Sequence, residues 1–201
     1  MARFKVGVFG SSAGEEIASA KAKAETLGTE LGSSGNLVIT GACSGLPYAA
    51  GAAAKKAGGE VWGFSPHKNF EEQKAATPDD DNSIYTKLFY VSEEFPFAND
   101  VSVCRKYRNV LSTATCDAGV IISGRWGTMH EFCSLYDFGK VIGILTDTSG
   151  VADELPALSR KISKESKAKV IFNSDPAELV QLVIKALTSP QPSPKSEREK
   201  G

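Results

Sequence analysis

Residues 118–138 read AGVIISGRWGTMHEFCSLYDF, and this stretch decides the fold class. The run 118–122 is apolar and rich in β-branched residues, as a central strand of a parallel sheet is. Residues 131–138 repeat apolar side chains at helical spacing, and Gly124 and Gly127 lie between the two patterns. A strand, a tight turn and the start of a helix therefore follow one another, which is the building unit of an α/β protein.

The junction between this strand and this helix is a candidate anion site. The first N–H groups of a helix have no partner within the helix, and the helix dipole places partial positive charge there. A phosphate is stabilised at such a position, so we expect Gly124, Arg125, Gly127 and Thr128 to bind one. Glu131 lies one turn into the helix, from where its carboxylate reaches the same ligand.

The same alternation of strand and helix patterns continues along the rest of the chain. Strands are predicted at Phe4–Phe9, Leu37–Thr40, Val61–Phe64, Leu88–Val91, Gly119–Ser123, Val141–Leu145 and Val170–Phe172. Helices are predicted at Glu15–Leu31, Leu46–Ala57, Val101–Thr115, Thr128–Phe138, Asp153–Ser166 and Pro176–Leu187. This order is typical of a doubly wound, mostly parallel sheet with helices on both faces, so we predict a single α/β domain over residues 1–187.

Two segments depart from this alternation. Residues 65–85 are polar and irregular, and we predict a long loop that lies over one end of the sheet. Residues 188–201 combine Pro190, Pro192 and Pro194 with a charged end. Such a composition buries too little apolar surface to fold, so a disordered tail is predicted there.

The composition favours a cytoplasmic protein that binds a small molecule. A chain of 201 residues, 41% of them hydrophobic, is long enough for one well-filled core. The net charge of −1 argues against a nucleic-acid partner, which requires a concentrated basic surface. No signal-peptide core and no membrane-spanning apolar run is present. The four cysteines form no C-x-x-C pair, and neither His67 nor His130 has a matched second ligand, so no metal is expected.

Three turns rich in glycine follow predicted strands. Because parallel strands bring their carboxyl ends to one edge of the sheet, we expect these turns to converge on one ligand. Besides the turn at residues 123–128, their candidate phosphate-binding residues are Gly10, Ser11, Ser12, Thr40, Gly41, Ser44 and Gly45. The first turn lacks the G-x-G-x-x-G spacing of dinucleotide sites, so a mononucleotide fits better than NAD, and no cofactor is predicted.

Several motifs resemble the LONELY GUY (LOG) family, which was long mislabelled as lysine decarboxylases. Its hallmark P-G-G-x-G-T-x-x-E is matched at Gly127-Thr128-x-x-Glu131, and residues 40–47 and 51–59 are similar to its second-strand turn and following helix. Arg108 lies nine residues before Asp117, as the arginine of the family precedes its central strand. The resemblance implies a Rossmann-like homodimer that cleaves the N-glycosidic bond of a nucleoside 5′-monophosphate, releasing a free base and ribose 5-phosphate.

The resemblance gives Glu131 and Arg108 catalytic roles. Cleavage develops positive charge on the sugar, which the Glu131 carboxylate would stabilise while it orients the attacking water. Arg108 would hold a phosphate or carboxylate with its two-pronged guanidinium. The alternative is that the two residues form only a structural ion pair. Ser123 and Arg125 replace a proline and a glycine of the family motif, so Arg125 either projects its charge towards the phosphate or fills the pocket.

Two other functions compete with hydrolysis. The same pocket would serve a binding or carrier protein for a nucleotide or another phosphate-bearing ligand, as in relatives that carry molybdenum cofactor. The pattern G-x-C-x-G at residues 41–45 also fits a nucleophile elbow with Cys43 as the nucleophile. That thiolate would need a base, for which only His67 and His130 are available.

Overall fold

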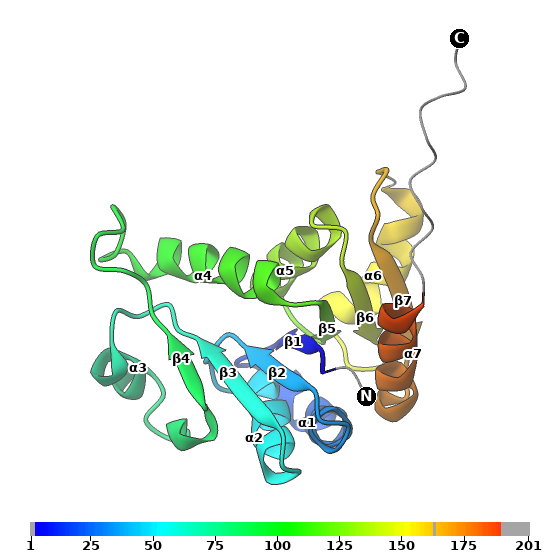
Figure 1. Cartoon of the computed structure of the whole chain (residues 1–201). Helices are drawn as coiled ribbons and strands as arrows, with labels where there is room; N and C mark the ends of the chain where they lie inside the picture. Colours follow the sequence, from blue (N-terminus) through cyan, green and yellow to red (C-terminus); the bar gives the residue numbers. More distant parts are fainter. Residues whose placement is uncertain (1–2, 163, 190–201) are drawn as a thin grey trace.

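The computed structural model describes residues 3–162 and 164–189. Its strands are β1 (Lys5–Gly10), β2 (Leu37–Thr40), β3 (Glu60–Phe64), β4 (Lys87–Phe89), β5 (Ala118–Ile122), β6 (Val141–Leu145) and β7 (Lys169–Asn173). Its α-helices are α1 (Glu16–Ser33), α2 (Leu46–Lys56), α3 (Phe70–Ala76), α4 (Val101–Thr115), α5 (Trp126–Asp137), α6 (Val151–Lys161) and α7 (Pro176–Thr188), and η1 (Asn82–Ile84) is a short 3₁₀ helix. Figure 1 shows their arrangement.

The strands form one seven-stranded sheet in the order β4-β3-β2-β1-β5-β6-β7. Every pair of neighbours in it is parallel, so the predicted doubly wound α/β fold is confirmed and the sheet is fully parallel rather than mostly parallel. The chain builds outward from β1 to β4 on one side and then crosses back to β5, which pairs with β1. The strand order therefore reverses between β1 and β5, the position at which open α/β sheets bind ligands.

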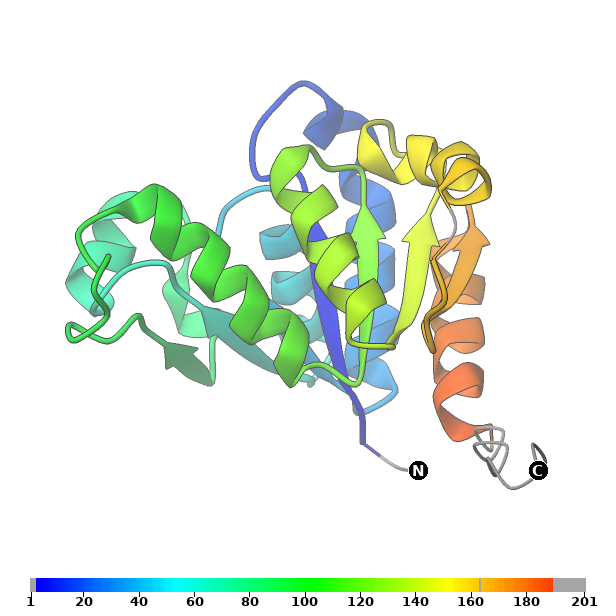
Figure 2. The same cartoon turned by 90° about the horizontal axis from the view of Figure 1, so that it is seen from above.

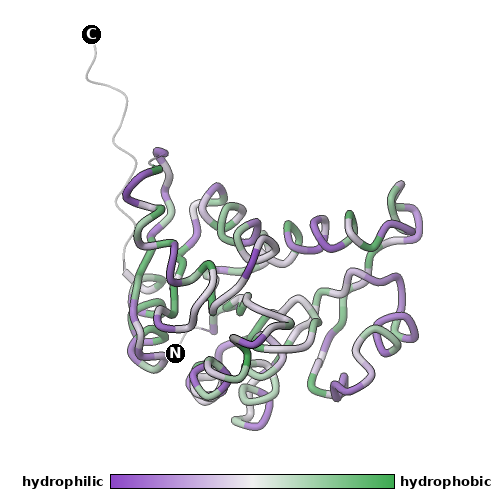
Figure 3. Tube along the Cα trace, turned by 180° about the vertical axis from the view of Figure 1, so that it is seen from behind, coloured by the Kyte–Doolittle hydropathy of each residue, from purple (hydrophilic) through white to green (hydrophobic). Residues whose placement is uncertain are grey.

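Helices cover both faces of the sheet, as the alternation predicts. Figure 2 shows α4 and α5 on one face and α1 and α2 on the other. Successive side chains of a strand point to opposite faces, so each strand supplies both layers. Val6 and Val8 pack with α1, α2 and α7, whereas Phe9 packs with α5 and α6. In Figure 3 hydrophobic residues follow the strands, and hydrophilic residues are interspersed on the helices around them.

The prediction that residues 65–85 are irregular is wrong, because this segment contains α3 and η1. Asn69 caps α3 by accepting a hydrogen bond from the Glu72 N–H at 2.9 Å. Gln73 is the buried residue of this helix, and Phe70 is 43% exposed. A helix that buries an amide side chain has no apolar stripe, so hydrophobic periodicity does not reveal it.

Some predicted boundaries also differ from the structure. Helix α5 begins at Trp126, two residues before the predicted Thr128, because Arg125 takes the extended N-cap conformation. Helix α6 covers Val151–Lys161 and ends five residues before the predicted Ser166. Helix α7 includes Thr188, the first residue of the predicted tail, and residues 190–201 lie outside the described part of the chain. Within that part, no helix combines the length and apolar character needed to cross a bilayer.

Candidate functional site

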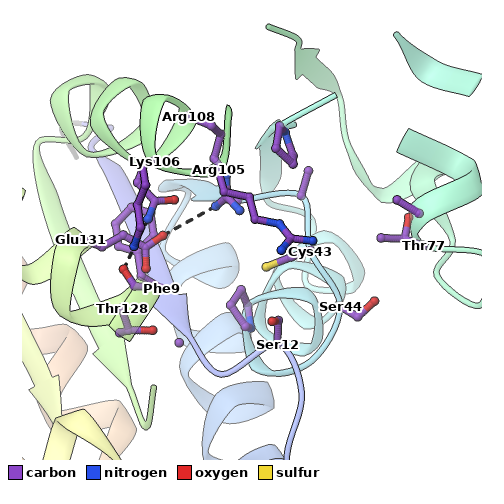
Figure 4. Close-up of a pocket in the computed structure, with 18 of the residues that line it drawn as sticks. Phe9, Ser12, Cys43, Ser44, Thr77, Arg105, Lys106, Arg108, Thr128 and Glu131 are labelled. Carbon is purple, nitrogen blue, oxygen red and sulfur yellow. Dashed lines mark hydrogen bonds and ion pairs between the residues drawn. The ribbon is translucent and has the colours of Figure 1, made fainter. Parts of the chain in front are cut away.

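A cavity of about 560 Å³ lies at the carboxyl ends of β1 and β2, beside the point where the strand order reverses. Its size falls within the range of about 300–1,000 Å³ that is usual for small-molecule sites. Turns after β1, β2 and β3 contribute to its wall, together with α4 and the first turns of α5 (Figure 4). The sequence-predicted residues that line it are Gly10, Ser12, Gly41, Ser44, Arg108, Gly127, Thr128 and Glu131.

The predicted residues Ser11 and Gly124 lie behind the cavity wall and join two of the glycine turns. The Gly124 N–H donates to Ser11 Oγ at 3.1 Å, and Ser11 Oγ lies 3.2 Å from Ser123 Oγ. The Ser123 N–H in turn donates to Thr148 Oγ1 at 2.8 Å, which extends the connection to the turn after β6. The structure therefore places these residues in the scaffold that holds the turns in register.

Thr40 and Gly45 likewise shape the second glycine turn from outside the cavity. Thr40 is fully buried, and its Oγ1 accepts a hydrogen bond from the Ala42 N–H at 3.2 Å. Gly45 precedes α2 with a φ of 81°, a backbone conformation that favours glycine. The Leu46 N–H donates to the Ser11 carbonyl, and Pro47 has no N–H. Few donors remain at the start of α2, so this helix offers a poor anion site.

Arg125 does not fill the cavity. It is exposed, does not line the cavity, and caps α5 with φ −128° and ψ −155°, an extended conformation that any residue adopts. Trp126 beside it is 84% exposed. The replacement of the family's glycine therefore leaves the space next to Thr128 and Glu131 open.

Arg108 and Glu131 meet at one end of the cavity (Figure 4). Arg108 Nη1 lies 3.6 Å from Glu131 Oε1, and the two side chains are only 10% and 8% exposed. Burial raises the pKa of Glu131 to about 7, although the charges of Arg108 and Lys106 oppose the change. At neutral pH both the protonated and the ionised forms of this carboxyl group are therefore populated, as suits a general acid or base.

Gly41 makes room for this pair. A side chain at Gly41 would overlap the Arg108 guanidinium, and Gly10 similarly leaves space for the carbonyl oxygen of Ile122. Asn109 helps to position Glu131, the other member of the pair. Its Nδ2 donates to the Gly127 carbonyl at 3.3 Å and so joins α4 to the start of α5, the helix that carries Glu131. Gly41 and Asn109 thus set the distance between Arg108 and Glu131.

A buried glutamine positions the second glycine turn. Gln73 Nε2 donates to the Ala42 carbonyl at 2.9 Å, and Gln73 Oε1 accepts from Ser65 Oγ at 2.7 Å. Ala42 has a φ of 47°, which is unusual for alanine and is held by this contact. Ser44, at the end of the turn, donates its hydroxyl to Asp80 Oδ2 at 2.7 Å.

Within the described residues, no three His, Cys, Asp or Glu side chains gather as a metal site would require.

Sequence reasoning missed five polar residues of the cavity wall. They are Ser102, Arg105, Lys106 and Asn109 of α4, and Thr77 at the end of α3. His67 of the turn after β3 also lines the cavity, although the sequence suggested it only as a base for Cys43. Ser102, Arg105, Lys106 and Asn109 follow the i, i+3, i+4, i+7 spacing of one helix face, which was the available signal. Burial lowers the pKa of His67; the neighbouring charge of Glu72 opposes this shift, and those of Arg105 and Arg108 add to it.

Cys43 lines the same cavity but is poorly suited to act as a nucleophile. Burial raises the pKa of its thiol, and the Arg108 charge only partly counteracts this. The thiol form is therefore favoured at neutral pH, whereas a nucleophile must be the thiolate. These properties favour a packing role for Cys43 over the nucleophile-elbow hypothesis.

Comparisons with solved structures reproduce the fold. The X-ray structure of the structural genomics target TM1055 has a TM-score of 0.73 and 20% identity, covering 90% of this chain and 99% of that one. The molybdenum cofactor binding protein of Rippkaea orientalis has a TM-score of 0.67 and 22% identity, covering 94% and 99%. DNA processing protein A of Helicobacter pylori, described with single-stranded DNA, has a TM-score of 0.64 and 18% identity, covering 92% and 80%.

The sequence comparison gives the family. No curated protein sequence matches the chain. The family model of the SLOG cluster4 family matches residues 3–180, which include all seven strands and every residue of the cavity wall. The resemblance to the LOG family that rests on Gly127, Thr128, Glu131 and Arg108 is thereby confirmed at the level of the wider group. The chain belongs to the SLOG cluster4 family.

Proposed function

We propose that this protein binds a nucleoside 5′-monophosphate in the cavity and hydrolyses its N-glycosidic bond. The observation that carries the proposal is the buried Arg108–Glu131 pair, with 3.6 Å between Nη1 and Oε1, in a cavity that also receives Arg105 and Lys106. A carboxyl group with a pKa of about 7 beside several cations suits a substrate that is anionic at one end and develops positive charge at the other.

The phosphate group would bind at the start of α5. Gly127 and Thr128 lie in the first turn, where N–H groups have no partner within the helix, and both line the cavity. Lys106 projects from α4 towards the same end, as Figure 4 shows. A phosphate held there would place the ribose against Glu131, which lies one turn further along α5.

The reaction requires one water molecule and one proton acceptor. As the bond between C1′ and the base nitrogen breaks, its electron pair moves to the nitrogen, which takes up a proton. The carboxylate of Glu131 would stabilise the positive charge on the sugar and accept a proton from the water that attacks C1′. Arg108 would hold Glu131 in place and favour its charged form, because its cation opposes the effect of burial.

Base release from a panel of nucleoside 5′-monophosphates tests the proposal. The purified chain should liberate the free base, detected by chromatography, and Glu131→Gln should abolish the release. Glu154→Gln is the matched control, because Glu154 is an exposed glutamate of α6 outside the cavity. Release that persists in Glu131→Gln would overturn the assigned mechanism.

A carrier role is the second candidate. It is favoured by the similar fold of the Rippkaea orientalis protein, which binds molybdenum cofactor. It is also favoured because, among the described residues, Glu131 is the only carboxylate in the cavity wall. A carrier needs the cations and the glycine turns but no proton transfer. Thermal stabilisation by nucleotides or another phosphate-bearing ligand, without release of a base, would support the carrier and overturn hydrolysis.

The expectation that nucleic acid is no partner rests on the net charge of −1. The Helicobacter pylori protein of similar fold binds single-stranded DNA, which weighs against this exclusion. Arg105 and Lys106 are exposed cations that a nucleic-acid phosphate would also contact. Binding of an oligonucleotide with a steep salt dependence would support such a partner, so the nucleotide panel should include single-stranded DNA.

The homodimer implied by the LOG resemblance is also a proposal. Tyr107, Val110 and Leu111 follow i, i+3, i+4 spacing on α4 and are 37%, 39% and 36% exposed. Phe97, 57% exposed, precedes the same helix, and Phe95 stacks on Tyr107 at a ring distance of 4.3 Å. We propose that a second copy of the chain covers this apolar face of α4.

A further inference from the structure

The cavity holds more positive charge than a single phosphate uses. Arg105, Lys106 and Arg108 line it. Glu131, the sole carboxylate that the described residues contribute to the wall, faces Arg108 at 3.6 Å. Among the described residues, no ion pair includes Arg105 or Lys106. Once Arg108 and Glu131 are set against each other, two cations therefore remain to face a ligand.

These two cations lie at opposite ends of the cavity. Consecutive residues of a helix point about 100° apart, and Figure 4 shows Lys106 towards Thr128 and Glu131 but Arg105 on the side of Cys43. The charges of Arg108 and Lys106 act on Glu131, whereas those of Glu72, Arg105 and Arg108 act on His67. Lys106 thus serves the proposed phosphate site at α5, and Arg105 lies away from it.

Further polar side chains line the cavity near Arg105. His67 and Ser102 supply them on this part of the wall.

We propose that the cavity has a second anion subsite, formed by Arg105 with His67, and that the ligand is a nucleotide with phosphates at two separate positions, such as a nucleoside 3′,5′-bisphosphate. This second subsite rests on the proposed nucleotide site at the start of α5, and it narrows the substrate class to nucleotides that carry two separate phosphates. One phosphate binds at the start of α5 beside Lys106, and the other binds beside Arg105. The guanidinium of Arg105 suits this task because it donates two parallel hydrogen bonds to a phosphate.

Calorimetric titration of the full chain tests the second subsite. The probes are the 5′-monophosphate, 5′-diphosphate and 3′,5′-bisphosphate of adenosine and of guanosine. Wild-type protein should bind a bisphosphate about tenfold more tightly than the monophosphate of the same nucleoside, as one further charge-assisted hydrogen-bonding site provides. Arg105→Gln should reduce this preference to about twofold or less. The matched control Arg160→Gln changes an exposed arginine of α6 outside the cavity and should preserve the preference.

The outcomes separate this proposal from the proposed hydrolysis. Equal affinity for monophosphate and bisphosphate, or a preference that survives Arg105→Gln, would overturn the second subsite. Tighter binding of the 5′-diphosphate than of the bisphosphate would place both phosphates at one end and would also overturn it. Base release is measured separately with the monophosphates: its absence, together with a bisphosphate preference that depends on Arg105, would refute hydrolysis and uphold the second subsite.

Discussion

Gly41 lies directly against the guanidinium of Arg108, so closely that a side chain at position 41 would overlap Nη1. The same Nη1 lies 3.6 Å from Glu131 Oε1. The glycine that follows β2 therefore lines the cavity and also leaves room for the arginine. A residue chosen from the sequence as a phosphate-binding glycine has a second task, which is to leave room for the buried ion pair.

Gly41→Ala should displace Arg108 and separate the pair. Because the atoms in the way are the far end of the flexible Arg108 side chain, we expect a loss of only about 1 kcal/mol in the free energy of unfolding. Base release should be about a hundredfold slower from misplacement of the site. Urea denaturation and chromatography measure the two effects. Gly127→Ala is the control for stability, because an added Cβ at Gly127 meets open space. Wild-type base release in Gly41→Ala would contradict the proposed displacement of Arg108.

Glu131 should make the stability of the protein depend on pH. Its pKa is raised from 4.5 to about 7 by burial, so the folded state holds the proton more tightly than the unfolded chain does. The resulting contribution favours folding at low pH and is lost between pH 4.5 and about 7, a change of about 3 kcal/mol. Glu131→Gln should remove this slope in urea denaturation, and Glu154→Gln should retain it.

The adjacent serines of the first turn should behave in opposite ways. Ser11→Ala removes the acceptor of the Gly124 N–H and should cost about 1–3 kcal/mol in the free energy of unfolding. Ser12 is exposed and lines the cavity, so Ser12→Ala should leave stability within about 0.5 kcal/mol and weaken nucleotide binding instead. Denaturation and calorimetry on the pair check this division, and equal destabilisation by both would contradict it.

Gln73→Leu tests how the second glycine turn is held. The change removes the donor to the Ala42 carbonyl and the acceptor of Ser65 Oγ, both buried, so we expect a loss of about 2–3 kcal/mol. Nucleotide binding should weaken as well, because Ala42 and its neighbours line the cavity. Gln181→Leu, at an exposed glutamine of α7, is the matched control. Unchanged binding in Gln73→Leu would show that the turn holds its shape without this contact.

The proposed dimer is tested by a charge on the outer face of α4. Leu111→Glu should shift the protein from dimer to monomer in sedimentation, because a buried unpaired carboxylate is strongly unfavourable. Leu182→Glu is the control, since Leu182 of α7 is exposed to a similar extent, 39% against 36%. A wild-type monomer, or a dimer that survives Leu111→Glu, would refute the proposed interface.

The strands and most helices were predictable because their apolar residues repeat regularly. Leu37–Thr40, Val141–Leu145 and Val101–Thr115 match the structure at both ends. Helix α3 was not predictable in this way, because it buries Gln73 rather than an apolar face. Its stability depends on hydrogen bonds to Ala42 and Ser65, which are distant in the sequence.

The site was predictable where a motif or strand end marked it. Glu131, Arg108 and Thr128 line the cavity as expected, and Glu131 and Arg108 meet. Ser11, Thr40, Gly45, Gly124 and Arg125 do not line it, because a glycine turn uses part of its small residues to join neighbouring turns. Arg105 and Lys106 were missed because a charged helix face usually indicates solvent, and only the tertiary structure shows which side of α4 covers a cavity.

The division of the wall between two helices separates the choice of ligand from the chemistry performed on it. Arg105 and Lys106, which would select anions in the proposed function, belong to α4, whereas Glu131, which would act on the bond, belongs to α5. The helices are joined through Asn109 and the Arg108–Glu131 contact, and residues 102–106 take no part in either connection. Substitutions at these positions should therefore redirect the protein to new ligands while the reacting centre stays intact, which makes α4 the place to begin in altering its specificity.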